Sequence, residues 1–306
     1  MTTQTAEAVP ETVRPWQPFR CRVQALRRLS PSFLRVTFGA EGLRHFADNG
    51  FDQRIKLIFP APACGFDKLP VSDRWYSELR ALPDDERCRV RTYTVRAVRR
   101  DLGEVDVDMV IHEPESGCDA PALRWALGAS VGDELVLLGP DARFGGVHGG
   151  IDFHAPAGAE LLIGGDETAA PAIAAILERL PTTARGRVFI EVPTAADALE
   201  LDRPPQVEVH WLARGGAWGE RLVPAVTAAA EGLDLTPQPQ EVDEIDVDRQ
   251  LLWEAPEQAG ACGAYAWVAA EAGAVKSIRR TLRRELGLPK ECGAFMGYWR
   301  AGRAAD

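Results

Sequence analysis

The hydrophobic pattern of the chain changes its period near residue 150, and this change constrains the fold more than any other feature. Before it, short stretches such as FLRVTFGA at 33–40 alternate apolar and polar residues. Such alternation is typical of antiparallel strands that bury one face. After it, continuous apolar runs such as AELLIGG at 159–165 alternate with helical segments, which is typical of a parallel sheet. The sequence therefore predicts two domains.

The first domain is expected at residues 18–150, as a six-stranded antiparallel β-barrel. Six strand-like segments lie between residues 19 and 140, and a short helix is expected at about 121–128. Short strands separated by turn signals are typical of a small closed barrel. Residues 1–17 lack the basic-then-apolar order of a secretion signal, and we expect them to form a disordered lead-in.

The second domain is expected at residues 151–306, as a doubly wound parallel sheet. In the segment at 166–180 the apolar residues share one helical face, Thr168 can cap the helix, and Pro171 suits its first turn. An acidic, proline-bearing stretch at about 232–260 interrupts the pattern. We expect it to be a solvated surface insertion, with a partner-binding role as the alternative.

Charge and spacing argue against several classes of function. The net charge of −10 disfavours nucleic acid binding. No apolar run approaches the ~18 residues of a membrane span, so we expect no membrane insertion and a cytoplasmic location. The six cysteines form no CxxC pair and the five histidines no HxxxH spacing, which argues against a metal site or a redox dithiol. The cysteines are expected to be buried small residues and surface thiols.

The segment RTYTVR at 91–96 is the strongest chemical motif of the first domain. On a strand, Arg91 and Tyr93 face one way and Thr94 the other. A guanidinium can bind a diphosphate bidentately, a phenol ring can stack on an isoalloxazine, and a threonine can hydrogen-bond the flavin near N5. The same residues also suit an ordinary strand.

A second motif lies where the first strand of the second domain turns into a helix. Gly165, Asp166, Glu167 and Thr168 occupy this turn, and small residues there let a diphosphate approach the backbone. The run does not match GxGxxG, so a tight turn without a ligand is an equal alternative. Glu271 lies at the carboxyl end of the fourth strand, where such sheets place ligand contacts.

Taken together, the chain resembles the siderophore-interacting protein family of NAD(P)H-dependent ferric siderophore reductases, which are flavoproteins with a ferredoxin-reductase-like fold. The resemblance rests on RTYTVR, on APALRWA at 120–126, on GGDETAAPA at 164–172 and on GYWRAG at 297–302. It covers nearly all of residues 18–303. It implies FAD in the first domain and a nicotinamide nucleotide in the second.

The resemblance also implies roles for individual residues. The FAD site is implied to contain Arg91, Tyr93, Thr94, His112, Ala120, Ala122 and Trp125, with Ala120 standing where the family usually has glycine. The nucleotide site is implied to contain Gly165, Asp166, Glu167, Thr168, Arg214 and Glu271. In reductases of this architecture a basic residue at the position of Arg214 often meets the 2′-phosphate of NADPH, which favours NADPH over NADH. A surface arginine without this role is the alternative.

The resemblance places the ferric siderophore beside the flavin. Lys56 matches a family lysine that meets the iron chelate, and Arg300 could add positive charge at the same opening. Tyr298 and Trp299 either shield the flavin or close the core. Electrons are implied to pass from NADPH or NADH through FAD to iron(III), with ferredoxin as an alternative donor. Hard oxygen ligands bind iron(II) far less well than iron(III), so reduction releases the metal.

Two other functions remain open from the sequence. A general NAD(P)H-dependent flavin or ferric reductase, or an electron-transfer partner of another enzyme, would share the flavin and nucleotide motifs without needing Lys56. A non-enzymatic siderophore-binding protein would keep the fold without using a reduced flavin.

Overall fold

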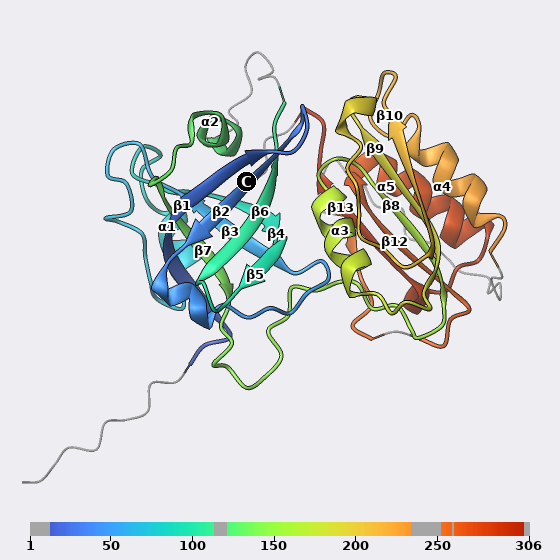
Figure 1. Ribbon diagram of the computed structural model, residues 1–306, viewed down its shortest axis with the longest axis horizontal. Helices are drawn as coiled ribbons and strands as arrows, with labels where there is room; N and C mark the ends of the chain where they lie inside the picture. Colours follow the sequence, from blue (N-terminus) through green and yellow to red (C-terminus); the bar gives the residue numbers. More distant parts are fainter. Residues whose placement is uncertain (1–12, 113–120, 234–251, 259, 303–306) are drawn as a thin grey trace, which may run out of the picture.

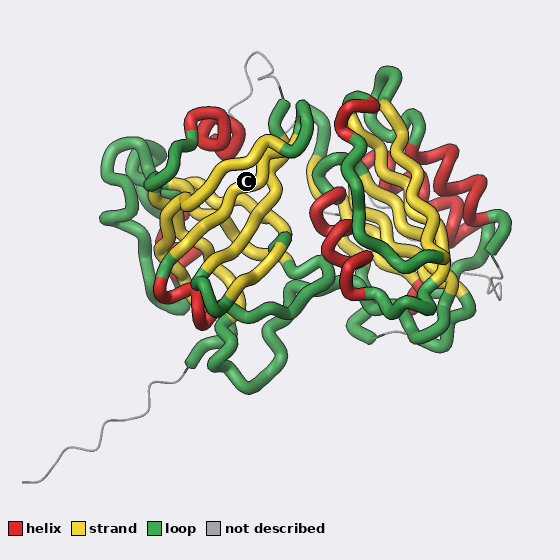
Figure 2. Tube along the Cα trace, viewed as in Figure 1, coloured by secondary structure: helices red, strands yellow, loops and turns green. Residues whose placement is uncertain are grey.

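The computed structural model describes residues 13–112, 121–233, 252–258 and 260–302. These residues form two β-sheets that lie side by side, each with its own helices (Figure 1). The strands of the first sheet curl around a core, whereas those of the second run in one twisted layer between helices (Figure 2).

The first sheet is antiparallel and has seven strands, in the spatial order β4-β3-β7-β1-β2-β6-β5. Its strands are β1 (Trp16–Arg28), β2 (Phe33–Gly39), β3 (Arg54–Phe59), β4 (Arg89–Thr94), β5 (Ala97–Arg99), β6 (Glu104–Val110) and β7 (Glu134–Pro140). The prediction of six strands was wrong because the segment that follows Cys88 breaks at Val95 and Arg96. Its first part pairs with β3 and its last part with β6. The sheet is therefore a curled half-barrel with β4 and β5 at its two edges.

Two helices accompany this sheet, α1 (Trp75–Arg80) and α2 (Pro121–Gly128). The bounds of α2 confirm the expected helix at 121–128. Alternation along the strands turns side chains such as Val36, Phe38 and Val107 into the core, and α2 adds Ala122 and Leu123 to the same cluster. Burial of these apolar side chains holds α2 across the curled sheet.

The second sheet is mixed and has the order β10-β9-β8-β12-β13-β11. Its strands are β8 (Glu160–Gly165), β9 (Arg185–Val192), β10 (Gln206–Ala213), β11 (Trp253–Glu254), β12 (Ala264–Glu271) and β13 (Gly293–Trp299). Five strands are parallel, but β11 pairs with β13 antiparallel. The expectation of a wholly parallel sheet was therefore wrong at this edge. Helix α3 (Ala170–Arg179) packs on one face, and α4 (Leu222–Ala230) and α5 (Ala272–Arg280) on the other.

Both expected irregular segments contribute to a sheet. Trp16 and Gln17, placed in the lead-in from sequence, belong to β1 and pair with β7, whereas residues 1–12 lie outside the described residues. Most of the predicted 232–260 insertion also lies outside them, but its end forms β11. There Glu254 makes ion pairs with Arg279 and Arg283, each at 2.6 Å, so this part of the stretch is packed sheet edge and not a surface loop.

A disulfide joins Cys262 to Cys292, with a Cα–Cα distance of 5.7 Å. The expectation of free thiols was wrong for this pair because the two residues are 30 positions apart in sequence, although they precede the neighbouring strands β12 and β13. In the described ranges no helix is long and apolar enough to cross a bilayer.

Candidate functional site

Strand β4, which carries RTYT, forms an edge of the first sheet and pairs with β3 on one side. Arg91 lies opposite Leu57 and Tyr93 opposite Ile55, so both side chains point to the core side of the sheet, as their alternation predicts. Tyr93 packs against the core cluster, and burial raises the pKa of its phenol well above the ordinary value. Thr94 is buried at the end of the strand.

Helix α2 places Trp125 against the same core. Its ring lies between Phe38 and Phe59, with centroid distances of 6.1 and 5.6 Å. Ala122 is buried beneath it. His112 is exposed two residues after the end of β6, and Ala120 lies outside the described residues. The structure thus brings Tyr93 and Trp125 onto one cluster at the open side of the half-barrel.

The donor set on this side of the half-barrel fits FAD. Beyond its pairing with β3, β4 has no partner strand within the part of the chain that is described, so one row of its backbone amides and carbonyls faces outward. Arg91 and the aromatic ring of Tyr93 lie on that strand. A cation for a diphosphate, a ring for stacking and a free strand edge for hydrogen bonds are the groups that a flavin nucleotide needs.

Lys56 lies on β3, directly opposite Thr92 of the RTYT strand. Its Nζ donates a hydrogen bond to Thr92 Oγ1 at 2.6 Å. Partial burial, and then the charge of Arg54, lowers the pKa of Lys56 below its ordinary value. A cation therefore lies beside the strand that is expected to carry the flavin.

Arg54 is a second cation that the sequence reasoning missed. It lies two residues before Lys56 on the same face of β3. It forms an ion pair with Asp152 at 3.0 Å and lies over the Trp253 ring at 4.4 Å. The sequence feature that could have identified Arg54 is the run Arg-Ile-Lys, since residues i and i+2 of a strand share a face.

The turn after β8 is organised around Asp166. Its carboxylate accepts hydrogen bonds from the backbone and hydroxyl of Thr168, from Glu271 N at 2.8 Å and from Trp299 Nε1 at 2.7 Å. Burial raises the pKa of Asp166. Thr168 does not cap α3 as expected, because its hydroxyl is bonded to Asp166 and the N-cap position is Ala169.

Arg214, directly after β10, is enclosed by carboxylates. It pairs with Glu167 and lies 3.3 Å from Glu191, and its guanidinium carbon is 5.8 Å from the Trp218 ring. Only 11% of its side chain is exposed. Burial, and then the charge of Asp166, raises the pKa of Glu167 to about 7, although Arg214 opposes the shift.

The carboxyl edge of β12 completes this group. The carboxylate of Glu271 accepts hydrogen bonds from Gly273 N at 2.6 Å and Ala274 N at 3.1 Å, and so caps α5. Another of its oxygens accepts from Ala301 N at 3.3 Å, which ties the end of the described chain to the same edge. The nucleotide-site residues predicted from sequence are thus brought together at one edge of the second sheet.

The aromatic residues of GYWRAG take two different places. Tyr298 stacks on Trp253 at 5.7 Å and closes the core, whereas Trp299 lies edge-on to Trp218 at 5.0 Å. Arg300 follows β13 and is half-buried. Tyr298 therefore packs against the core of the second sheet, and a role of either residue in shielding the flavin stays a prediction.

Glu191 and Trp218 at this edge were also missed from sequence. Glu191 is fully buried and accepts hydrogen bonds from the backbones of Gly219, Arg221 and Leu222. The sequence feature that could have identified Glu191 is a carboxylate inside the otherwise apolar strand RVFIEV, because a buried charge needs partners. Trp218, 39% exposed, stands in a glycine-rich loop where a large aromatic residue is unusual.

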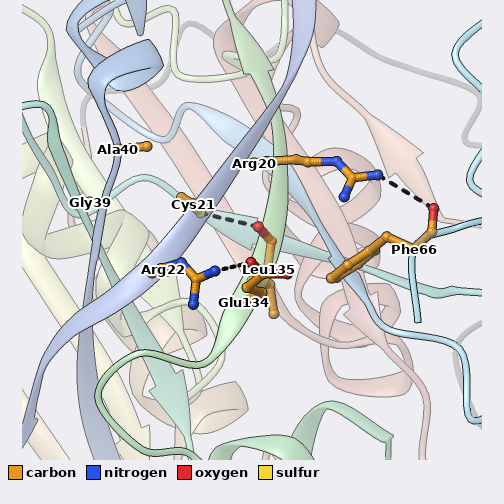
Figure 3. Close-up of a pocket in the computed structure, with 8 residues that line it drawn as sticks. All are labelled: Arg20, Cys21, Arg22, Gly39, Ala40, Phe66, Glu134 and Leu135. Atoms are coloured by element: carbon orange, nitrogen blue, oxygen red, sulfur yellow. Dashed lines mark hydrogen bonds and ion pairs between the residues drawn. The ribbon is translucent and has the colours of Figure 1, made fainter.

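The cavity shown in Figure 3 is lined by none of these residues and is formed mainly by β1, β2 and β7. It holds about 270 Å³ and is lined by Arg20, Cys21, Arg22, Gly39, Ala40, Phe66, Glu134 and Leu135. A second cavity of about 480 Å³ shares Arg20, Phe66 and Glu134 with it and extends to Trp125. Among the described residues, no group of three or more His, Cys, Asp or Glu side chains could hold a metal ion.

Two family models match the chain, one in each sheet region. The siderophore-interacting FAD-binding domain matches residues 22–144, and the siderophore-interacting protein model matches residues 158–302. The ferric vibriobactin reductase ViuB of Vibrio cholerae is 31% identical, over 90% of this chain and 86% of that protein.

Solved structures show the same fold. The siderophore-interacting protein SipS from Aeromonas hydrophila has a TM-score of 0.66 at 27% identity, covering 94% of this chain and 93% of that one. Ferredoxin–NADP⁺ reductase from Plasmodium falciparum has a TM-score of 0.53 at 13% identity, covering 87% of this chain and 89% of that one. The last likeness concerns the two-domain fold alone.

Proposed function

Because the chain belongs to the siderophore-interacting protein family, we propose that it is a ferric siderophore reductase. It takes electrons from a reduced nicotinamide nucleotide, passes them through FAD and reduces an iron(III)–siderophore, so that iron(II) is released. Residues 18–150 bind FAD and residues 151–306 bind the nucleotide. A cytoplasmic location stays a prediction, as does ferredoxin as an alternative donor.

One observation carries this proposal, namely the position of Lys56. Its Nζ donates a hydrogen bond to Thr92 in the middle of the RTYT strand. Arg54 lies on the same face of β3 as Lys56. Ferric siderophores often carry net negative charge, so cations beside the flavin strand would attract and orient them. The likeness to ViuB, whose name states a ferric reductase activity, supports the same assignment.

FAD, when bound, accepts two electrons from a nicotinamide and donates them one at a time, which suits a one-electron acceptor such as iron(III). The protein supplies position and charge. Arg91 would bind the diphosphate, Tyr93 would pack against the flavin, and Thr94 would hydrogen-bond it. His112, Ala122 and Trp125 line the rest of the FAD site, together with Ala120. Lys56 and Arg300 hold the siderophore.

The test is anaerobic stopped-flow spectroscopy of the FAD-loaded protein. The flavin should bleach with reduced nicotinamide nucleotide and recover its colour when a ferric siderophore is added. Lys56→Ala should slow recovery with an anionic ferric siderophore by about tenfold, as expected for loss of one partly desolvated charge contact. The matched control is Lys68→Ala, because Lys68 lies on the same domain and pairs with Glu86 at the surface.

The same experiment separates the two alternative functions. A general flavin or ferric reductase predicts equal losses with ferric siderophores and with uncharged dyes when Lys56 is replaced. A non-enzymatic siderophore-binding protein predicts no bleaching of the flavin by either nucleotide. In either case the ferric siderophore reductase assignment would be abandoned.

A further inference from the structure

We infer that the nucleotide site of this chain selects NADH over NADPH, and that Glu167 is the residue that sets this selectivity. The inference rests on the proposed function and concerns which nucleotide feeds it. It replaces the expectation that Arg214 binds the 2′-phosphate of NADPH.

The guanidinium of Arg214, directly after β10, is already paired with carboxylates of the protein. Arg214 makes an ion pair with Glu167 through Nη2, and its Nε faces Glu191 at 3.3 Å. Trp218 lies beside the guanidinium at 5.8 Å. With 11% of the side chain exposed, a 2′-phosphate could bind this guanidinium only by displacing a carboxylate from it. Breaking a buried ion pair in this way leaves a charge without compensation, which is strongly unfavourable.

The surroundings of Arg214 also disfavour a second phosphate. Besides Glu167 and Glu191, Asp166 and Glu271 lie at the same sheet edge, where the Asp166 carboxylate accepts a hydrogen bond from the backbone N–H of Glu271. A phosphate that approaches this edge meets several carboxylates in a poorly solvated place, where each one that is ionised repels it strongly. A ribose 2′-hydroxyl, in contrast, can donate a hydrogen bond to a carboxylate, which is how dinucleotide sites commonly recognise NADH.

Glu167 is the replaceable contact of Arg214. Glu191 is fully buried and anchored by the backbone N–H groups of Gly219, Arg221 and Leu222, so it is part of the loop structure. The side chain of Glu167 bonds to Arg214 and lies in the turn expected to meet the nucleotide. Neutralising Glu167 should therefore free Arg214 for a phosphate without dismantling the loop after β10.

Arg221 provides a matched control on the same loop. It is exposed, and its guanidinium lies within 3.4 Å of the point where a side chain on Gly215 would begin. If an arginine of this loop other than Arg214 recognised a 2′-phosphate, Arg221 would be the candidate. Arg221→Ala thus tests the position of the phosphate contact.

The experiment is isothermal titration of the FAD-loaded protein with adenosine 2′,5′-bisphosphate and with 5′-AMP, which differ by the 2′-phosphate. The wild type should bind 5′-AMP at least as tightly as the bisphosphate. Glu167→Gln should shift the affinity ratio toward the bisphosphate by about tenfold, as expected for release of one charge pair. The double variant Glu167→Gln/Arg214→Ala should lose that gain, and Arg221→Ala should leave the ratio unchanged. Stopped-flow reduction of the flavin should favour NADH in the wild type.

Four results would each overturn the inference. The first is wild-type preference for the bisphosphate, and the second is an unchanged ratio in a Glu167→Gln protein that melts at the wild-type temperature. The third is loss of bisphosphate binding in Arg221→Ala, and the fourth is absence of binding by both analogues. Failure of the proposed function looks different, because the analogue ratio can be measured even when neither nucleotide reduces the flavin.

Discussion

Replacement of Asp52 by asparagine should reveal a buried charge at the junction of the two sheets. Asp52 is fully buried just before β3. Its carboxylate accepts hydrogen bonds from Asp152 N at 3.2 Å and Phe153 N at 3.1 Å, in the chain that connects the sheets, and from Trp267 Nε1 at 3.2 Å on β12. Asparagine keeps the shape and one acceptor oxygen but removes the charge.

The magnitude follows from the pKa of Asp52. Burial, and then the charge of Asp152, raises this pKa from 3.8 to about 6, against the effect of the hydrogen bonds. An acid whose pKa is raised in the folded state holds its proton more tightly when folded, so the folded protein loses stability as pH rises between these two values. At about 1.4 kcal/mol per pKa unit, the ionised carboxylate costs roughly 3 kcal/mol above pH 6.

The assay is urea unfolding of wild type and Asp52→Asn from pH 4 to pH 8. The difference in free energy of unfolding should move in favour of the variant by roughly 2 kcal/mol between pH 4 and pH 6.5, because part of the wild-type loss already occurs below pH 4, and should then change little. Groups distant from the junction titrate equally in both proteins, so their contributions cancel when the wild-type free energy of unfolding is subtracted from that of the variant. Two parallel stability curves would refute the assignment of a destabilising buried charge.

Three further substitutions test the packing. Asp197→Ala removes the carboxylate that accepts hydrogen bonds from the Ser30 hydroxyl and the Ser32 N–H across the two sheets, and should cost about 3 kcal/mol in chemical unfolding; a cost below about 0.5 kcal/mol would contradict it. Gly186→Ala places a Cβ 2.2 Å from Leu161 O at a φ of 152°, so the midpoint of thermal unfolding should fall by more than about 5 °C; an unchanged midpoint would show that β8 and β9 pair differently. Cys262→Ser opens a cross-link between positions 30 apart and should cost about 3.5 kcal/mol without reductant; an equal cost with reductant present would disprove the disulfide.

Local periodicity was sufficient to predict the elements that carry the motifs. Alternation placed Arg91 and Tyr93 on one face of a strand, and the 3.6-residue pattern located α3, with Pro171 in its first turn. The prediction failed where one continuous β-like segment had to divide. Val95 and Arg96 suit a strand as well as their neighbours do, and only the pairing of the flanking residues with β3 and β6 separates β4 from β5.

The rest of the site depends on contacts between residues far apart in sequence. Arg214 and Glu167 are 47 positions apart, and no local pattern shows that they meet at a sheet edge. The sequence therefore placed Arg214 directly after a sheet strand, where the structure has it, but gave no sign that its charge is compensated. For the same reason the antiparallel pairing of β11 with β13 was missed, since it depends on Trp253 meeting Met296.

The most direct test of the account is to count the iron released for each nucleotide consumed. The FAD-loaded protein is mixed anaerobically with a reduced nicotinamide nucleotide, a ferric siderophore and a colorimetric iron(II) chelator, and nucleotide oxidation is followed at the same time. A hydride carries two electrons and iron(III) takes one, so about two iron(II) ions should appear per nucleotide, and none without FAD. Oxidation of the nucleotide with no iron(II) trapped, or a rate independent of FAD, would contradict the account.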